Sequence, residues 1–134
     1  MKIAPIVIGI ALGLGACAPI TVPMPVQPFP DIPVPARWIP YSDDWAIIRT
    51  PKVTAARLIY FTETSVDATL ADARALLTNA GWTESRSERF VNAERFPGVW
   101  VEFLKESDIC RVTVIEGSKA THVDYTIARV TPSV

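Results

Sequence analysis

The chain has 134 residues, of which 49% are hydrophobic and 20% are charged, and its formal net charge at pH 7 is −1. That balance excludes the strongly basic surface with which proteins bind nucleic acid. A chain of this length supports one folded domain with a modest core rather than several domains.

The N-terminus has the features of a secretory signal peptide. Met1-Lys2 gives a short positive start, and the apolar run over residues 3–14 is too short to span a bilayer as a permanent helix. Directly after it, Leu14-Gly15-Ala16-Cys17 resembles the lipobox of bacterial lipoproteins. This resemblance implies cleavage between Ala16 and Cys17, and it implies diacylglycerol and N-acyl lipid on Cys17. The alternatives are an ordinary signal peptide with a chance cysteine and an uncleaved anchor.

The residue after the cysteine bears on which membrane of the cell envelope holds the lipoprotein. In Gram-negative lipoproteins an aspartate at this position is the usual signal for retention in the inner membrane, whereas this chain has Ala18. The resemblance therefore implies anchorage at the periplasmic face of the outer membrane. The two or three acyl chains of a lipoprotein make detachment rare.

Prolines dominate the next segment, at positions 19, 23, 25, 28, 30, 33, 35 and 40. Such a segment prefers polyproline II, so we expect residues 17–37 to be a lipidated cysteine followed by a stiff spacer. Its second half, residues 29–39, is too apolar to remain in water, and we expect it to dock on the folded domain. The alternative is a proline-rich ligand for the aromatic groove of a partner.

The folded domain is expected over residues 38–134, and its clearest element is a helix over residues 66–80. An apolar stripe of helical period predicts this helix. Thr64 or Ser65 is suited to cap its start, and Gly81 suits the left-handed position after its end. The members of the stripe are Val66, Leu70, Ala73, Leu77 and Ala80.

Runs rich in valine, isoleucine, threonine and aromatic residues predict strands on both sides of the helix. Turn residues such as Pro97-Gly98 separate these runs. The resulting order is ββαββββ, which predicts an α+β fold with an antiparallel sheet packed against one helix. The expected strands are residues 45–50, 57–62, 82–91, 99–105, 109–116 and 122–130.

Alternation within the strands predicts which side chains face the core. On the strand after the helix, Glu84, Arg86 and Glu88 alternate in sign and are expected on one solvated face. The expected core residues of the last three strands are Val99, Val101, Phe103, Cys110, Val112, Val114, Val123, Tyr125 and Ile127.

The whole pattern resembles a family of small bacterial outer-membrane lipoproteins of unknown function. Besides the lipobox, the resemblance rests on the spacer ending Asp31-Ile32-Pro33-Val34-Pro35, on the helix ending Ala80-Gly81-Trp82, and on the strand Asp108-Ile109-Cys110-Arg111-Val112-Thr113-Val114. It implies a compartment and a fold but no activity. A looser architectural likeness is to the small lipoproteins that accompany the outer-membrane β-barrel assembly machine, and fold likeness does not establish function.

Few residues are candidates for chemistry. His122 is the only histidine, and Asp124 shares its strand face, so the two form the one candidate catalytic or metal-binding pair. Once Cys17 is acylated, Cys110 is the remaining thiol, and its place among core residues favours an inert side chain. The sequence therefore nominates no catalytic residue, cofactor or metal.

Four tryptophans, Trp38, Trp45, Trp82 and Trp100, offer a different kind of site. At least two are expected in the core, and an exposed one would be suited to contact a partner.

The acidic residues at positions 43, 44, 67 and 72 indicate no site, because Asp67 suits the positive end of a helix dipole and Asp72 is on another helix face.

These observations predict a membrane-tethered, non-enzymatic lipoprotein that binds or scaffolds a protein of the cell envelope. One alternative is an envelope enzyme or metal-binding protein that uses His122 and Asp124. Another is a phage-type lysis lipoprotein, which shares the lipobox and the prolines.

Overall fold

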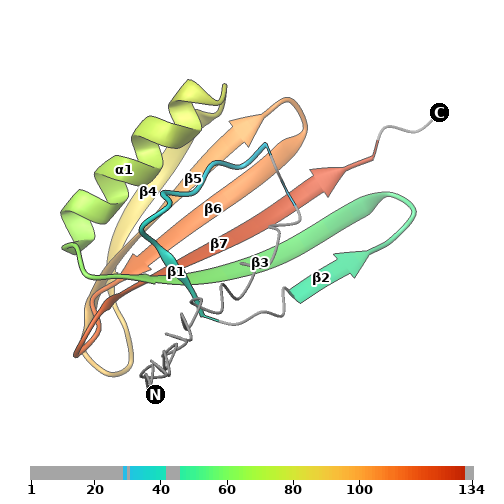
Figure 1. The fold of residues 1–134 in the computed structure, drawn as a ribbon. Helices are drawn as coiled ribbons and strands as arrows, with labels where there is room; N and C mark the ends of the chain where they lie inside the picture. The colour runs from blue at the N-terminus through green and yellow to red at the C-terminus, as the bar shows by residue number, and fades with distance from the viewer. Residues whose placement is uncertain (1–28, 30, 42–45, 132–134) are drawn as a thin grey trace, which may run out of the picture.

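The computed structural model describes residues 29, 31–41 and 46–131. In these residues the chain forms one antiparallel sheet with a helix on one face (Figure 1). No helix in the described ranges is long and apolar enough to cross a membrane. The elements are β1 (Ile39–Pro40), β2 (Ala46–Arg49), β3 (Val53–Thr62), α1 (Val66–Asn79), β4 (Thr83–Val91), β5 (Pro97–Lys105), β6 (Asp108–Ile115) and β7 (Thr121–Val130).

The sheet dominates the fold, and the predicted α+β class with the order ββαββββ is wrong. The described chain has seven strands in 53% of its residues and a single helix in 14%. One strand was missed because Ile39–Pro40 looks like the end of a proline spacer, yet it pairs with β3 at an edge, where a missing N–H is tolerated. In addition, β3 begins at Val53 rather than at residue 57. The domain is therefore an antiparallel sheet with one accessory helix.

The strands lie in the order β1-β3-β7-β6-β5-β4, with β2 also paired to β3, and all neighbours are antiparallel. β3 and β7 pair over their full length, from Val53 opposite Val130 to Thr62 opposite Thr121. Because β4 lies at the far edge, the helix that connects β3 to β4 crosses the sheet. It packs over β4, β5 and β6 (Figure 1).

The helix begins and ends close to where the sequence predicts. Ser65 is the N-cap, and its hydroxyl accepts a hydrogen bond from the backbone N–H of Ala68 at 3.2 Å. At the other end Gly81 has a φ of +90°, and the N–H of Trp82 donates to the carbonyl of Leu77 at 3.0 Å. This ending is a Schellman motif, which favours glycine at the left-handed position.

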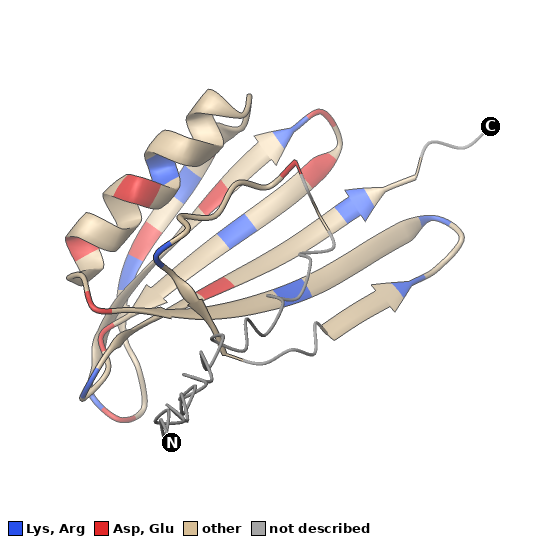
Figure 2. Ribbon diagram, viewed as in Figure 1, with Lys and Arg blue, Asp and Glu red and all other residues tan. Residues whose placement is uncertain are grey.

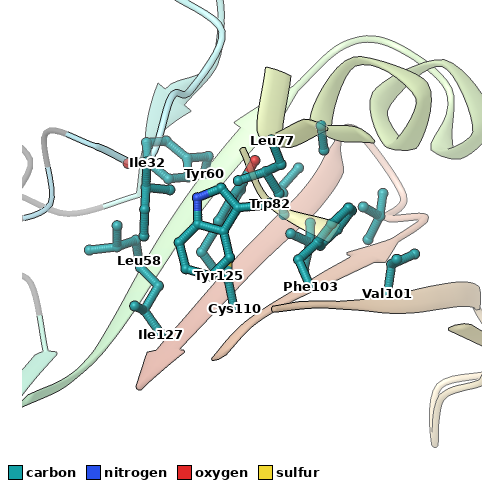
Figure 3. Close-up of a cluster of buried hydrophobic side chains, with 14 of the residues drawn as sticks. Ile32, Leu58, Tyr60, Leu77, Trp82, Val101, Phe103, Cys110, Tyr125 and Ile127 are labelled. Carbon is teal, nitrogen blue, oxygen red and sulfur yellow. The ribbon is translucent and has the colours of Figure 1, made fainter. Parts of the chain in front are cut away.

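The sheet face that α1 covers, the inner face, carries the core. Leu70, Ala73 and Leu77 of the helix pack onto it. Figure 3 shows the strand side chains gathered with Leu77 and Trp82. The predicted core is confirmed, because all nine expected strand residues are at most 3% exposed: Val99, Val101, Phe103, Cys110, Val112, Val114, Val123, Tyr125 and Ile127.

The docking segment, residues 29 and 31–38, covers the part of the inner face that the helix leaves open. Ile32 and Trp38 are buried, and Phe29 belongs to the same core cluster. The Trp38 ring centroid lies 6.1 Å from that of Tyr60 on β3 and 6.0 Å from that of Tyr125 on β7. The apolar half of the proline-rich segment is thus part of the core in its described residues.

Ion pairs fix the start of the docking segment to one end of the sheet. Arg129 on β7 donates from Nη2 to Asp31 at 2.5 Å and from Nε to Asp108 on β6 at 2.8 Å. Its guanidinium carbon also lies 5.1 Å from the centre of the Phe29 ring. One arginine therefore joins the docking segment to two central strands.

A β-bulge on β4 changes which side chains reach the solvent. The register shifts between Glu84 and Arg86, so Ser85 is an extra residue that reverses the alternation. Glu84 lies on the helix side, where Arg74 donates to it at 2.9 Å. Arg86 and Glu88 lie on the opposite face of the sheet, the outer face. The prediction that the three charged residues share one face is therefore wrong for Glu84.

Candidate functional site

Neither α1 nor the docking segment covers the outer face, because both lie on the inner face. Figure 2 shows positive and negative residues interspersed along the strands of the sheet rather than gathered in a region of one charge. Two features stand out on this face, a tryptophan between two arginines and a shallow pocket.

The first feature is the Trp100 cluster, which consists of Trp100, Arg86, Arg111 and Glu102. The guanidinium carbons of Arg111 and Arg86 lie 4.4 Å and 5.4 Å from the centre of the Trp100 ring. Both arginines also donate to Glu102, at 3.0 Å and 3.2 Å. These contacts hold a half-buried indole in one orientation midway along β5, one strand in from the β4 edge of the sheet.

The arginines also set the charge state of the carboxylate in this cluster. The pKa of Glu102 is lowered from its ordinary value of 4.5, first by the hydrogen bond from Arg86 and then by that from Arg111. Glu102 is therefore ionised at neutral pH, so the cluster holds two guanidinium groups and one carboxylate, and Glu88 of β4 lies directly opposite Trp100.

Sequence reasoning did not find this cluster, although it did consider that any exposed tryptophan could contact a partner; Trp100 itself is half-buried. Trp100 and Glu102 alternate along β5 with core residues, and this alternation is the sequence pattern that predicts that the two side chains share one face. The contribution of Arg111 from β6 depends on the strand register, which pairs it with Glu102. Trp38 and Trp82 are buried, as expected for two of the four tryptophans, and Trp45 lies outside the described residues.

The structure places His122 and Asp124 on the same face of β7, but it gives them different partners. Asp124 accepts from Arg57 on β3, with Nε at 2.7 Å and Nη2 at 2.5 Å, and this pairing raises the pKa of Arg57. The His122 ring packs edge-on against Phe61, with 4.6 Å between ring centroids. In the described part of the chain no ion pair joins His122 to Asp124, and no three metal-ligating side chains come together.

His122, Asp124 and Arg57 line a pocket of about 320 Å³, which is the second feature of the outer face. Ile59, Ile115 and Tyr41 supply apolar walls, while Arg57 and Asp124 supply a closed ion pair at one side. Arg57 contacts only Oδ2 of Asp124, and Oδ1 is buried with no hydrogen-bond partner among the described residues, so the pocket combines apolar walls with one unpaired carboxylate oxygen.

Cys110 is inaccessible from the pocket because it lies on the inner face. It is fully buried, and burial raises the pKa of its thiol to about 12, with a further contribution from the charge of Asp31. A thiol with this pKa is protonated at neutral pH and is a poor nucleophile.

The remaining candidates from the sequence fall into two groups. Asp67 pairs with Arg89 and Asp72 pairs with Arg37, so the helix carboxylates are separate surface ion pairs. The lipobox, including Ala16 and Cys17, lies outside the described residues, as do Ala18 and the acidic pair at positions 43 and 44.

Comparisons with family models, curated proteins and solved structures found no match to this chain.

Proposed function

We propose that this protein is a non-enzymatic lipoprotein, held through lipid on Cys17 at the periplasmic face of the outer membrane, whose sheet binds an envelope protein. The lipid anchor follows from the lipobox resemblance, and the destination follows from Ala18. The binding surface would be the part of the outer face over β4, β5 and β6, where the Trp100 cluster lies.

The Trp100 cluster is the single observation that carries the binding role. Tryptophan and arginine are the residue types that contribute most to protein interfaces, particularly at the centre of a contact patch. Here the indole is already fixed by two guanidinium groups, so little side-chain entropy would be lost on binding. The two guanidinium groups of the cluster suit a partner that presents a carboxylate beside apolar side chains.

Photo-crosslinking in intact cells tests the binding role. A photoreactive residue at Thr113, which is adjacent to Trp100 across the β5–β6 ladder, should crosslink one specific envelope protein. The same residue at Ala75, on the exposed side of α1, is the control and should not. Trp100→Ala should abolish the crosslink from position 113. Equal yields from positions 113 and 75 would argue against the outer face.

Two substitutions test the anchor separately. Cys17→Ser should prevent incorporation of labelled fatty acid, and Ala18→Asp should move a large part of the protein to the inner-membrane fraction. Labelling that persists in Cys17→Ser would refute the lipid assignment, and an unmoved Ala18→Asp variant would refute the sorting assignment.

A further inference from the structure

The end of the outer face that includes the β5–β6 turn carries a continuous row of apolar side chains. Strand register places Leu104, Ile109, Ala128, Ala55 and Ile48 opposite one another across β5, β6, β7, β3 and β2. Val130 and Val53 form the next pair beyond this row. The apolar row, defined as these seven residues, thus crosses five strands without a charged side chain.

Four of the seven side chains of the row are exposed, and the other three, Val53, Ala55 and Ala128, are half-buried. Ile48 is 69% exposed, Ile109 and Val130 are each 43% exposed, and Leu104 is 40% exposed. These four are a majority of the seven large apolar side chains that are exposed in the described residues. Single exposed apolar residues are ordinary, but a continuous group on one face indicates a contact surface.

The path of the chain brings the proposed lipid attachment site within reach of this surface. Arg129 holds Asp31 at the same end of the sheet, and Figure 1 shows the start of the described chain beside the β5–β6 end. Phe29 is only twelve residues after Cys17. At about 3.1 Å per residue, even a fully extended polyproline II chain would keep this end of the sheet within roughly 37 Å of the lipid.

Charge at the same end is compatible with a phospholipid surface. Arg49 and Lys52 flank the turn between β2 and β3, and Figure 2 shows positive residues at this hairpin. The β5–β6 turn contributes Lys105 and Glu106, which offset each other. Basic residues beside an exposed apolar row are typical of proteins that rest on anionic membranes.

We propose that the apolar row rests on the bilayer that holds the lipid of Cys17. This inference depends on the lipid anchor of the proposed function. The tether makes contact with the bilayer intramolecular, so a surface too weak to bind a membrane alone is sufficient. Contact through one end of the sheet leaves the Trp100 cluster, nearer the middle of the outer face, accessible to a protein partner.

Depth-dependent fluorescence quenching tests this orientation. The full-length lipidated protein is reconstituted into vesicles of phosphatidylethanolamine and phosphatidylglycerol, with a fluorophore on Leu104→Cys or, as the control, on Ala75→Cys of α1. Nitroxide-labelled lipids should quench the label at position 104 several-fold more than the label at position 75. Introducing Ile48→Asp together with Val130→Asp should reduce the quenching at position 104 severalfold without reducing flotation with the vesicles.

Flotation separates the two proposals. A protein that fails to float with vesicles refutes the lipid anchor and, with it, the membrane contact. A protein that floats but shows equal quenching at positions 104 and 75 refutes the membrane contact alone. Disulfide-linked pairs of the unlabelled Leu104→Cys chain in the same vesicles would assign the row to a second copy and would also overturn the proposal.

Discussion

Ile32→Ala should destabilise the domain strongly, although Ile32 lies before residue 38, where the sequence predicts that the folded domain begins. Its side chain is fully buried in the core cluster. Truncation removes three buried carbons, worth about 0.8 kcal/mol each, or roughly 2.4 kcal/mol in total. The cavity left beneath the docking segment adds to this, so we expect a loss of about 2.5–5 kcal/mol in the free energy of unfolding.

Urea unfolding followed by tryptophan fluorescence measures this loss. The variants should be made in a Cys17→Ser background so that lipid does not enter the comparison. Ile48→Ala is the matched control, because it removes the same atoms from a side chain that is 69% exposed and should change stability by less than about 0.5 kcal/mol. A domain has a net stability of only about 5–15 kcal/mol, so the difference should be plain in the unfolding midpoint. If both variants unfold at the same urea concentration, the docking segment is not part of the core.

Three further predictions concern the core thiol, the Trp100 cluster and two glycines. Cys110 should resist thiol reagents at pH 8 in the native protein and react once urea is added, because its pKa is about 12; a native reaction at the rate of a free thiol would contradict its burial. Since the folded-state pKa of Glu102 lies below 4.5, its stabilisation is present above pH 4.5 and is lost as the pH falls through the folded pKa. Glu102→Gln should therefore flatten the acid side of the stability curve, and an unchanged curve would refute the pKa shift. Gly117→Ala should cost about 1–3 kcal/mol, because its Cβ would lie 2.3 Å from the carbonyl oxygen of Ala120, whereas Gly98→Ala meets only a movable ring and should cost less in the same unfolding assay.

Local patterns in the sequence were sufficient for the helix and for most of the core. The helix has an apolar stripe, a serine at its start and a glycine at its end, and all three features act within a few residues. The inward positions of β5, β6 and β7 follow from strict alternation, because each of these strands has one buried face and one open face.

Features that depend on distant segments were not predicted. Ile39–Pro40 forms a strand only because the edge of β3 is available, and no local propensity indicates this pairing. Ser85 is an extra residue in β4 that moves the residues after it to the opposite faces, and the alternating charges of this strand give no indication of the bulge. The same limitation applies to the site, since Arg111 meets Trp100 through strand register and Asp124 meets Arg57 from a strand 67 residues away.

The long ladder between β3 and β7 has a consequence for the order of folding. It joins Val53 to Val130, so a central pairing of the sheet has to wait until nearly the entire chain is available. Closing such a long loop before its contacts form lowers the folding rate, and sheets of this kind fold in milliseconds to seconds rather than microseconds. A chain that stops before β7 would leave β3 and β6 without their shared neighbour, with two unpaired strand edges exposed to aggregation.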